Sequence, residues 1–316
     1  MGEGAGTKAG PEPGPGPDDR DELRPRPSWL GALGRSVYGP TPPSGAVPCP
    51  RTSALSADEA GEVVAIIYRG RSERHSETLP ERLQTRDWGS VLAVAQALEE
   101  RATGQRAGWK IGAAAEEIRR AEGVPSPSPG RIYRHTVFES PAELPSKLFI
   151  NYRNCECEFA FELAVDFPAR DKPYTEADAA AGVEAMYPAL ELGDTVFLDW
   201  YGASAYFGSC MDNGGGAAFV KGTAVSDWAS MDLPNAAMDV YLNGYYVKSG
   251  KGGAAMGHPL TSLTWMLNWL RERGRSAEAG EFVSTGTCTG HLFALPGDTI
   301  LADFGDLGRV EAKFLP

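Results

Sequence analysis

The stretch CECEFAFEL, residues 155–163, constrains the fold more than any other part of this sequence. Its odd positions hold cysteine, phenylalanine and leucine, whereas its even positions hold Glu156, Glu158, Ala160 and Glu162. This period of two predicts a β-strand with one apolar face and one acidic face. Alternate residues on a strand lie about 6.6 Å apart, so Glu156 and Glu158 would project side by side. Burying both without a cation would raise the pKa of at least one.

Two interpretations fit such an acidic face. An antiparallel strand commonly exposes one face to water, and a hydrated face needs no further explanation. In the other interpretation, a divalent cation lies between the carboxylates. The segment YPALELGD, residues 187–194, favours the cation because it adds Glu191 and Asp194 at the end of a mainly apolar segment. Three carboxylates from two strands would leave about three positions of an octahedral Mg²⁺ ion open for water or substrate.

Composition divides the chain into parts. Residues 1–50 contain 11 prolines and 10 glycines. Such a segment buries too little apolar surface to offset its ordering entropy, so we expect a disordered Pro/Gly-rich tail over residues 1–55. Residues 56–146 are expected to form an N-terminal helical or cap part of the catalytic domain. Residues 147–316 are richer in strand-like segments and are expected to form the core that carries the acidic strand.

Local signals predict the secondary structure. Ser56 and Glu59 form a capping box that begins a helix. Asn243-Gly244 predicts a tight β-hairpin over residues 238–247. We expect further helices after Thr85 and over 113–123, 176–186 and 259–274, a loop over 124–130, and further strands over 107–112, 148–167, 187–194, 214–222, 281–290 and 298–314. Strands and helices alternate irregularly, which favours an α+β fold with a large mixed sheet or barrel.

Charge and hydropathy exclude several classes of protein. The net charge is −12 and no cluster of Lys or Arg stands out, so we expect no nucleic-acid partner. No apolar run approaches the roughly 20 residues of a membrane span, and the first residues lack the apolar segment of a signal peptide. We therefore expect a cytoplasmic protein without a membrane partner. The scattered cysteines do not form a disulfide framework, and Cys155 and Cys157 are expected to fill the apolar strand face.

Other residues have the character of a site. Lys110 lies between glycines in GWKIG, and Asp212 and Asn213 precede three glycines whose loop could offer N–H groups to an anion. His258 stands just before an expected helix. Each also has an ordinary interpretation: a lysine reaching the surface, a common turn, or a helix-capping histidine. His291 is compatible with either the core or a site.

The order of these motifs resembles that of one protein family. GWKIG, Glu-x-Glu, PALELGD, DNGGG, GHPL and STGT follow one another over roughly residues 56–316, as in the 2-keto-4-pentenoate hydratase / 4-oxalocrotonate decarboxylase group of the fumarylacetoacetate hydrolase superfamily. The resemblance implies an α+β fold with a mixed β-barrel or β-roll core and outer helices. It also implies a Mg²⁺ or Mn²⁺ cofactor, and we expect a homo-oligomer.

The resemblance further implies roles for individual residues. The metal-binding carboxylates of the family correspond to Glu156, Glu158 and Glu191, and its active-site lysine corresponds to Lys110. The remaining expected site residues are Asp212 as a second catalytic group and, for substrate binding, Asn213, Gly214, His258 and Thr285. Where the hydratases tend to have Ala-Ser-Ser, this chain has three glycines beginning at Gly214, so the hydroxyl groups that might define a substrate are missing.

The implied chemistry is a lyase reaction on a 2-oxo acid. A divalent cation would polarise the keto group and stabilise enolate charge. Lys110 would act as an acid/base group or as a carboxylate partner, with a pKa lowered by burial and by the metal. Glu162, Asp194 or an ordered water is the expected second proton carrier. The leading expectation is addition of water to a 2-hydroxy-2,4-dienoate; the alternatives are decarboxylation of a 2-oxo-3-enedioate, C–C hydrolysis of an acylpyruvate, and a catalytically silent binding protein.

Overall fold

The computed structural model describes residues 51–197 and 205–316, so the predicted tail over 1–50 lies outside the described residues. The helices are α3 Ala57–Glu73, α4 Trp88–Arg101, α5 Glu116–Glu122, α6 Glu176–Ala181, α7 Ala205–Met211 and α8 Pro259–Arg271. The strands are β1 Arg106–Gly112, β2 Ser128–Tyr133, β3 Val137–Glu139, β4 Ala142–Leu144, β5 Asn154–Leu163, β6 Val183–Gly193, β7 Gly216–Lys221, β8 Ala237–Leu242, β9 Tyr245–Lys251, β10 Phe282–Ser284, β11 Leu292–Phe293, β12 Thr299–Asp303 and β13 Arg309–Phe314.

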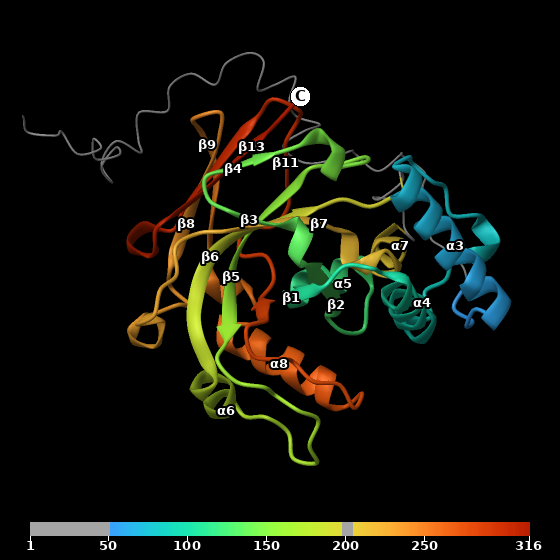
Figure 1. Ribbon diagram of the computed structural model, residues 1–316, viewed down its shortest axis with the longest axis horizontal. Coiled ribbons are helices and arrows are strands. Elements are labelled where there is room, and N and C mark those ends of the chain that lie inside the picture. Colours follow the sequence, from blue (N-terminus) through green and yellow to red (C-terminus); the bar gives the residue numbers. More distant parts are fainter. Residues whose placement is uncertain (1–50, 198–204) are drawn as a thin grey trace, which may run out of the picture.

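The strands form two curled sheets that face a common core (Figure 1). The larger sheet has the order β2-β1-β10-β5-β6-β7-β3, and β11 also pairs with β5. The smaller sheet has the order β4-β13-β12-β8-β9. The pairs β1–β10, β3–β7 and β4–β13 are parallel, whereas β5 pairs with β6 in the antiparallel sense. This mixture confirms the predicted α+β class with a mixed sheet.

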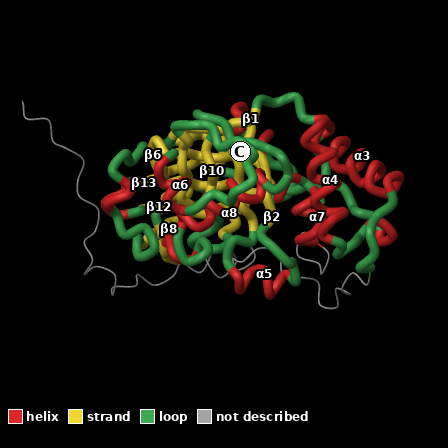
Figure 2. The backbone as a smooth tube through the Cα atoms, turned by 90° about the horizontal axis from the view of Figure 1, so that it is seen from below, coloured by secondary structure: helices red, strands yellow, loops and turns green. Residues whose placement is uncertain are grey.

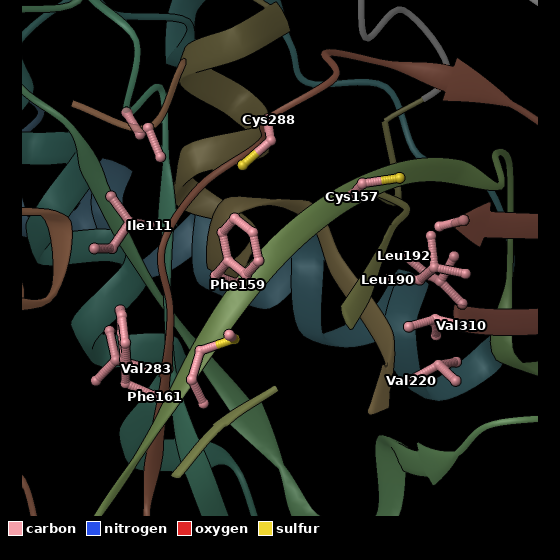
Figure 3. Packing of buried hydrophobic residues seen from close by; sticks show 14 of the residues in the cluster. Ile111, Cys157, Phe159, Phe161, Leu190, Leu192, Val220, Val283, Cys288 and Val310 are labelled. Carbon is pink, nitrogen blue, oxygen red and sulfur yellow. The ribbon is translucent and has the colours of Figure 1, made fainter. Parts of the chain in front are cut away.

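The alternation in β5 determines which of its residues enter the core. Figure 3 shows residues of the main apolar cluster, with Phe161 of β5 beside Val283 of β10, and Cys157 of β5 on the side of Leu190 and Leu192 of β6. The free cysteines of β5 are buried, as predicted. Burying a large apolar side chain contributes roughly 1.5–3 kcal/mol, so this face fixes the register of the strand. The glutamates between these residues must then point away from the apolar cluster.

A second apolar cluster joins helices α3, α4 and α7, which lie together at one end of the molecule (Figures 1 and 2). The predicted capping box begins α3, because the Ser56 hydroxyl accepts from the Glu59 amide and the Glu59 carboxylate accepts from the Ser56 amide. Val63 and Ile67 of α3 and Val91 of α4 are fully buried in this cluster. The three helices therefore share an apolar cluster that is separate from the main cluster between the sheets.

Several predicted boundaries are wrong. The helix predicted over 176–186 ends at Ala181, because the following residues from Val183 belong to β6 and pair with β5. The loop predicted over 124–130 contains the start of β2, whose Ser128 pairs with Gly112. The predicted strand over 281–290 is limited to β10. The hairpin turn at Asn243-Gly244 is confirmed, and both residues have the positive φ that such a turn needs.

The predicted division of the chain near residue 146 stays a prediction. Strands β1 to β4 come from the N-terminal side of this boundary and belong to the two sheets, since β1 pairs with β10 and β4 pairs with β13. Within the described residues, none of the helices combines the length and the apolar character needed to cross a membrane.

Candidate metal and active site

Three carboxylates meet on the polar side of β5 and β6. Glu156 and Glu158 come from β5, and Glu191 of β6 stands directly opposite Glu156 in the antiparallel register. One oxygen of each residue lies within 4.8 Å of one oxygen of the other two. Glu158 and Glu191 are only 1% and 5% exposed. The acidic face is therefore buried at these positions, and the hydrated-surface interpretation does not apply to them.

The end of β10 and the segment that follows it position the two carboxylates of β5. The Ser284 hydroxyl and the Gly286 amide donate to Glu158 Oε2 over 2.6 and 2.8 Å. Further along the same segment, His291 Nδ1 lies 2.6 Å from Glu156 Oε1. Because this segment runs beside β5, it fixes the direction of both glutamates and leaves their other oxygens available.

Lys110 of β1 holds the third carboxylate. Its Nζ lies 2.5 Å from Glu191 Oε1 and donates to the Gly214 carbonyl over 2.8 Å. The lysine is 3% exposed. Gly130 of β2 stands opposite Lys110, and a Cβ added there would lie 2.7 Å from Lys110 Cγ. A glycine at this position therefore makes the room that the buried lysine needs.

Burial of several carboxylates together perturbs their protonation. Burial, followed by the charges of Glu191 and Glu156, raises the pKa of Glu158 well above its ordinary value. Burial also raises the pKa of Glu191, against the opposing effect of Lys110. Burial acts the same way on Glu156, but His291, together with Lys110 and Asn154, outweighs it and lowers the pKa of Glu156. A cation bound among these oxygens would relieve the repulsion that raises the pKa of Glu158.

The protonation of Lys110 depends on the carboxylates around it. Burial alone would lower the pKa of Lys110, but the charges of Glu191, Glu156 and Glu158 outweigh burial and raise it. The expected lowering assumed a bound metal and stays a prediction, but its argument left out the ion pair with Glu191. In this arrangement Lys110 is an ammonium group that carries a proton into the site.

A cavity of about 40 Å³ lies against the Lys110–Glu191 pair. Its lining includes Glu156, and it also includes Asn154 and Thr287. Among the described residues, Glu191 Oε2, Asn154 Oδ1 and Thr287 Oγ1 are buried oxygens without a hydrogen-bond partner. Since buried polar atoms are nearly always paired, these oxygens indicate that the cavity receives a ligand. The three glutamates offer carboxylate oxygens, of which Glu191 Oε2 has no hydrogen-bond partner. Such oxygens suit a hard divalent cation such as Mg²⁺ or Mn²⁺.

The expected residues Asn213 and Gly214 lie beside Lys110. Asn213 Oδ1 accepts from the Arg131 amide over 2.8 Å, and Asn213 Nδ2 donates to the Arg131 carbonyl over 2.9 Å. This pair of bonds joins the glycine loop to β2. It places the Gly214 carbonyl where it can accept from Lys110, and Gly214 lines the cavity.

The structure does not bring His258 and Thr285 to this cavity. His258 Nδ1 accepts from the Leu260 amide over 2.9 Å and caps α8, which is the ordinary interpretation of that residue. The Thr285 hydroxyl donates to the Phe159 carbonyl over 2.9 Å and is fully buried. Neither residue belongs to the lining of the cavity that contains Glu156 and Glu191.

The residues named as second proton carriers also have structural partners. Glu162 Oε2 accepts from the Tyr187 hydroxyl over 2.7 Å and from Lys221. The Asp194 carboxylate accepts from the backbone amides of residues 150–152. Asp194 also lines the cavity, but its carboxylate oxygens are engaged by the backbone that precedes β5.

Sequence reasoning missed two residues of the cavity and left a third undecided. Asn154 has the same parity as Glu156, so the alternation of β5 could have indicated it. Thr287 lies in the STGTCTG segment, but no local pattern distinguishes its hydroxyl from that of Thr285. His291 belongs to the site rather than to the apolar core, since it contacts Glu156.

Asp212 has a set of partners that indicates a structural role. Its carboxylate accepts two hydrogen bonds from Arg71, over 2.9 and 2.8 Å, and one each from the Thr195 hydroxyl and the Val196 amide. Asp212 is fully buried. These bonds join α3 to the end of α7 and to the chain after β6. The catalytic role expected for Asp212 stays a prediction.

We expect Asp212→Ala to lower the free energy of unfolding by about 3 kcal/mol, because it removes the carboxylate that pairs with Arg71 and leaves the buried Val196 amide without its acceptor. Urea unfolding measures this loss. Glu116→Ala removes an exposed pair with Arg120 and is the matched control, with no measurable change expected. An Asp212→Ala protein with wild-type stability and no turnover would instead favour the catalytic role.

Comparison with known proteins agrees with this geometry. No known family profile matches the chain. The chain is 31% identical over 215 residues to the 2-hydroxyhexa-2,4-dienoate hydratase of Comamonas testosteroni, which covers 67% of this chain and 80% of that enzyme. The chain belongs to the 2-keto-4-pentenoate hydratase / 4-oxalocrotonate decarboxylase family. The named relatives in this family are hydratases and decarboxylases, which are lyases.

Other relatives extend the match. The 2-keto-4-pentenoate hydratase 1 of Dechloromonas aromatica is 27% identical over 267 residues, covering 83% of this chain and 98% of that enzyme. The 4-oxalocrotonate decarboxylase of Pseudomonas putida is 30% identical over 138 residues, and the aligned part covers 44% of this chain and only 52% of that enzyme.

Solved structures confirm the expected fold. The 4-oxalocrotonate decarboxylase of Pseudomonas putida G7, solved with calcium and acetate, has a TM-score of 0.73 at 23% identity, covering 84% of this chain and all of that one. The same enzyme has also been solved with magnesium and adipate. A fumarylacetoacetate hydrolase family protein from Yersinia pestis has a TM-score of 0.51 at 14% identity and covers 68% of this chain.

Proposed function

We propose that this protein is a divalent-metal-dependent hydro-lyase that adds water to a 2-hydroxy-2,4-dienoate or to its 2-oxo-alkenoate tautomer. The observation that carries the proposal is the meeting of a buried ammonium group with buried carboxylates at one cavity. The hydratases among the relatives support the reaction type. The decarboxylases support the alternative, loss of CO₂ from a 2-oxo-3-enedioate.

In this proposal Glu156, Glu158 and Glu191 hold Mg²⁺ or Mn²⁺ through their oxygens. When bound, such a cation supplies Lewis-acid stabilisation of the negative charge that develops on a 2-oxo group. Ser284, Gly286 and His291 keep the β5 carboxylates in place by the contacts described above. Holding the ligands in place in this way typically strengthens metal binding.

Lys110 acts on the substrate with its ammonium group. Its position between Glu191 and the Gly214 carbonyl orients Nζ toward the cavity edge. From there it can donate a proton to a substrate carbon or pair with a substrate carboxylate. The lining residue Ile111 contributes an apolar surface that helps to exclude bulk water.

A third reaction, C–C hydrolysis of an acylpyruvate, calls for a histidine and a carboxylate that activate water. The contact between His291 and Glu156 offers such a pair. Because Glu156 also belongs to the carboxylate cluster, it is not free to serve the histidine alone. This reaction therefore ranks behind hydration and decarboxylation.

A panel of 2-oxo acids tests the function. We expect the protein with Mg²⁺ or Mn²⁺ to consume a 2-hydroxy-2,4-dienoate, followed as loss of its ultraviolet absorbance, without releasing CO₂. Release of CO₂ from a 2-oxo-3-enedioate with no hydration of the dienoate would favour the decarboxylase. Turnover that is unchanged after metal removal by a chelator would contradict the whole proposal.

We also propose that the protein acts on its small-molecule substrate as a homo-oligomer in the cytoplasm, with no nucleic-acid or membrane partner. The net charge of −12 supports the absence of a nucleic-acid partner. Light scattering at several protein concentrations measures the assembly, and a monomer at every concentration would contradict it.

A further inference from the structure

The cavity is also lined by polar side chains that belong neither to the proposed metal site nor to the contacts of Lys110. Asn154 and Thr287 both line the cavity, and each has a buried oxygen without a hydrogen-bond partner. We propose that Asn154 Oδ1 and Thr287 Oγ1 bind the water molecule that adds to the substrate. This inference rests on the proposed hydratase function and names the residues that hold its second reactant.

The backbone places both residues around the carboxylate cluster. The segment 285–293 runs antiparallel to β5, because the Thr285 amide donates to the Phe159 carbonyl and the Cys288 amide donates to the Cys157 carbonyl. At its end, β11 pairs Leu292 with Cys155. The anchors of the two β5 carboxylates therefore follow one another along this segment.

Thr287 lies between those anchors. Gly286, immediately before it, donates to Glu158, and His291, four residues later, contacts Glu156. Asn154 stands two residues before Glu156 on the same face of β5, and its Nδ2 donates to Glu156 Oε1 over 3.2 Å. Since Nδ2 is engaged in this way, Oδ1 is the part of Asn154 that remains to accept a hydrogen bond.

The size and chemistry of the cavity fit a small hydroxylic ligand. Its volume of about 40 Å³ exceeds the roughly 10–15 Å³ that one water needs. Asn154 Oδ1 accepts only, whereas the Thr287 hydroxyl both accepts and donates. A water that donates to both oxygens keeps a lone pair for the substrate. A carboxylate could not donate to Asn154 Oδ1, so these oxygens favour water or a hydroxyl group.

The addition balances with the residues already described. A lone pair of the bound water forms the C4–O bond of a 2-oxo-3-enoate, and the π electrons of C3=C4 form the C3–H bond. Lys110 gives its proton to C3 and recovers one from the water that has become the C4 hydroxyl. The sum is the addition of one H₂O, with no oxidant, reductant or other reactant.

The test compares the hydration product with an analogue that lacks the hydroxyl group formed from the added water. The hydroxyl of 4-hydroxy-2-oxopentanoate would occupy the place of the added water, and 2-oxopentanoate lacks that hydroxyl. We expect calorimetric titration in the presence of Mn²⁺ to show the hydroxylated ligand binding roughly tenfold more tightly to the wild type. Thr287→Val should reduce this preference to about twofold or less, and Thr287→Ser should restore it.

Thr289→Val is the matched control. Thr289 Oγ1 accepts from the Cys157 amide and lies outside the cavity lining, so the ligand preference should stay at the wild-type value. Equal affinities of the wild type for the two ligands would overturn the inference, and so would an unchanged preference in Thr287→Val. If neither 2-oxo acid binds to the metal-loaded wild type, the proposed function itself fails and this inference fails with it.

Discussion

Lys110→Met is expected to lower turnover by roughly 10²–10⁴-fold, the usual contribution of a positioned acid or base. The methionine keeps most of the volume of the lysine stem but carries no proton. In the native protein Lys110 is 3% exposed, and its ammonium group contacts Glu191 and the Gly214 carbonyl. The measurement is the rate of dienoate consumption at saturating Mn²⁺.

Metal binding should survive this change, because it removes a positive charge beside three carboxylates. Calorimetric titration with Mn²⁺ should therefore give an affinity equal to or higher than that of the wild type. Lys221→Met is the matched control. Lys221 pairs with Glu162 over 3.1 Å in the same sheet, outside the cavity lining, so its loss should leave turnover nearly unchanged. Full activity in a folded, metal-loaded Lys110→Met protein would remove Lys110 from the mechanism.

The parts of the site that could be predicted are those that depend on local periodicity. The alternation over 155–163 predicted that Glu156 and Glu158 share a face, because side-chain direction alternates along any strand. The glycines around Lys110 indicated a close approach, and Gly108 confirms it, because a Cβ added there would lie 2.0 Å from the Phe282 carbonyl oxygen. The capping box at Ser56 and the turn at Asn243 were also local signals, and both are confirmed.

The parts that could not be predicted depend on contacts between distant segments. Glu191 was expected at the site, but its place opposite Glu156 depends on the register of β5 and β6, and the helical composition of 176–186 hid the start of β6. Asp212 was expected at the site, but its partner Arg71 lies 141 residues away in the chain. Thr287 and Thr285 look alike in the sequence, and only the path of the segment beside β5 separates them.

Glu158→Gln is expected to remove most of the stabilisation that Mn²⁺ gives to the protein. A ligand that binds only the native state at a hundredfold excess over its Kd stabilises that state by about 2.7 kcal/mol. A neutral amide in place of a carboxylate weakens a hard-cation site, because it removes one of its negative charges. Thermal unfolding with and without Mn²⁺ measures the difference. Glu162→Gln, on the same strand and with the same parity, should respond to Mn²⁺ as the wild type does.

Without metal, the difference in melting temperature between the wild type and Glu158→Gln should have the opposite sign. Because the pKa of Glu158 is raised in the folded state, the native protein binds this proton more tightly than the unfolded chain does. The resulting stability is fully present below the ordinary pKa of glutamate and is lost as the pH rises through the raised pKa. Glutamine resembles the protonated form at every pH. At neutral pH, metal-free Glu158→Gln should therefore melt at a higher temperature than metal-free wild type, and the two should converge in acid. An identical response to Mn²⁺ in wild type and Glu158→Gln would contradict the metal site, whatever the behaviour of the metal-free proteins.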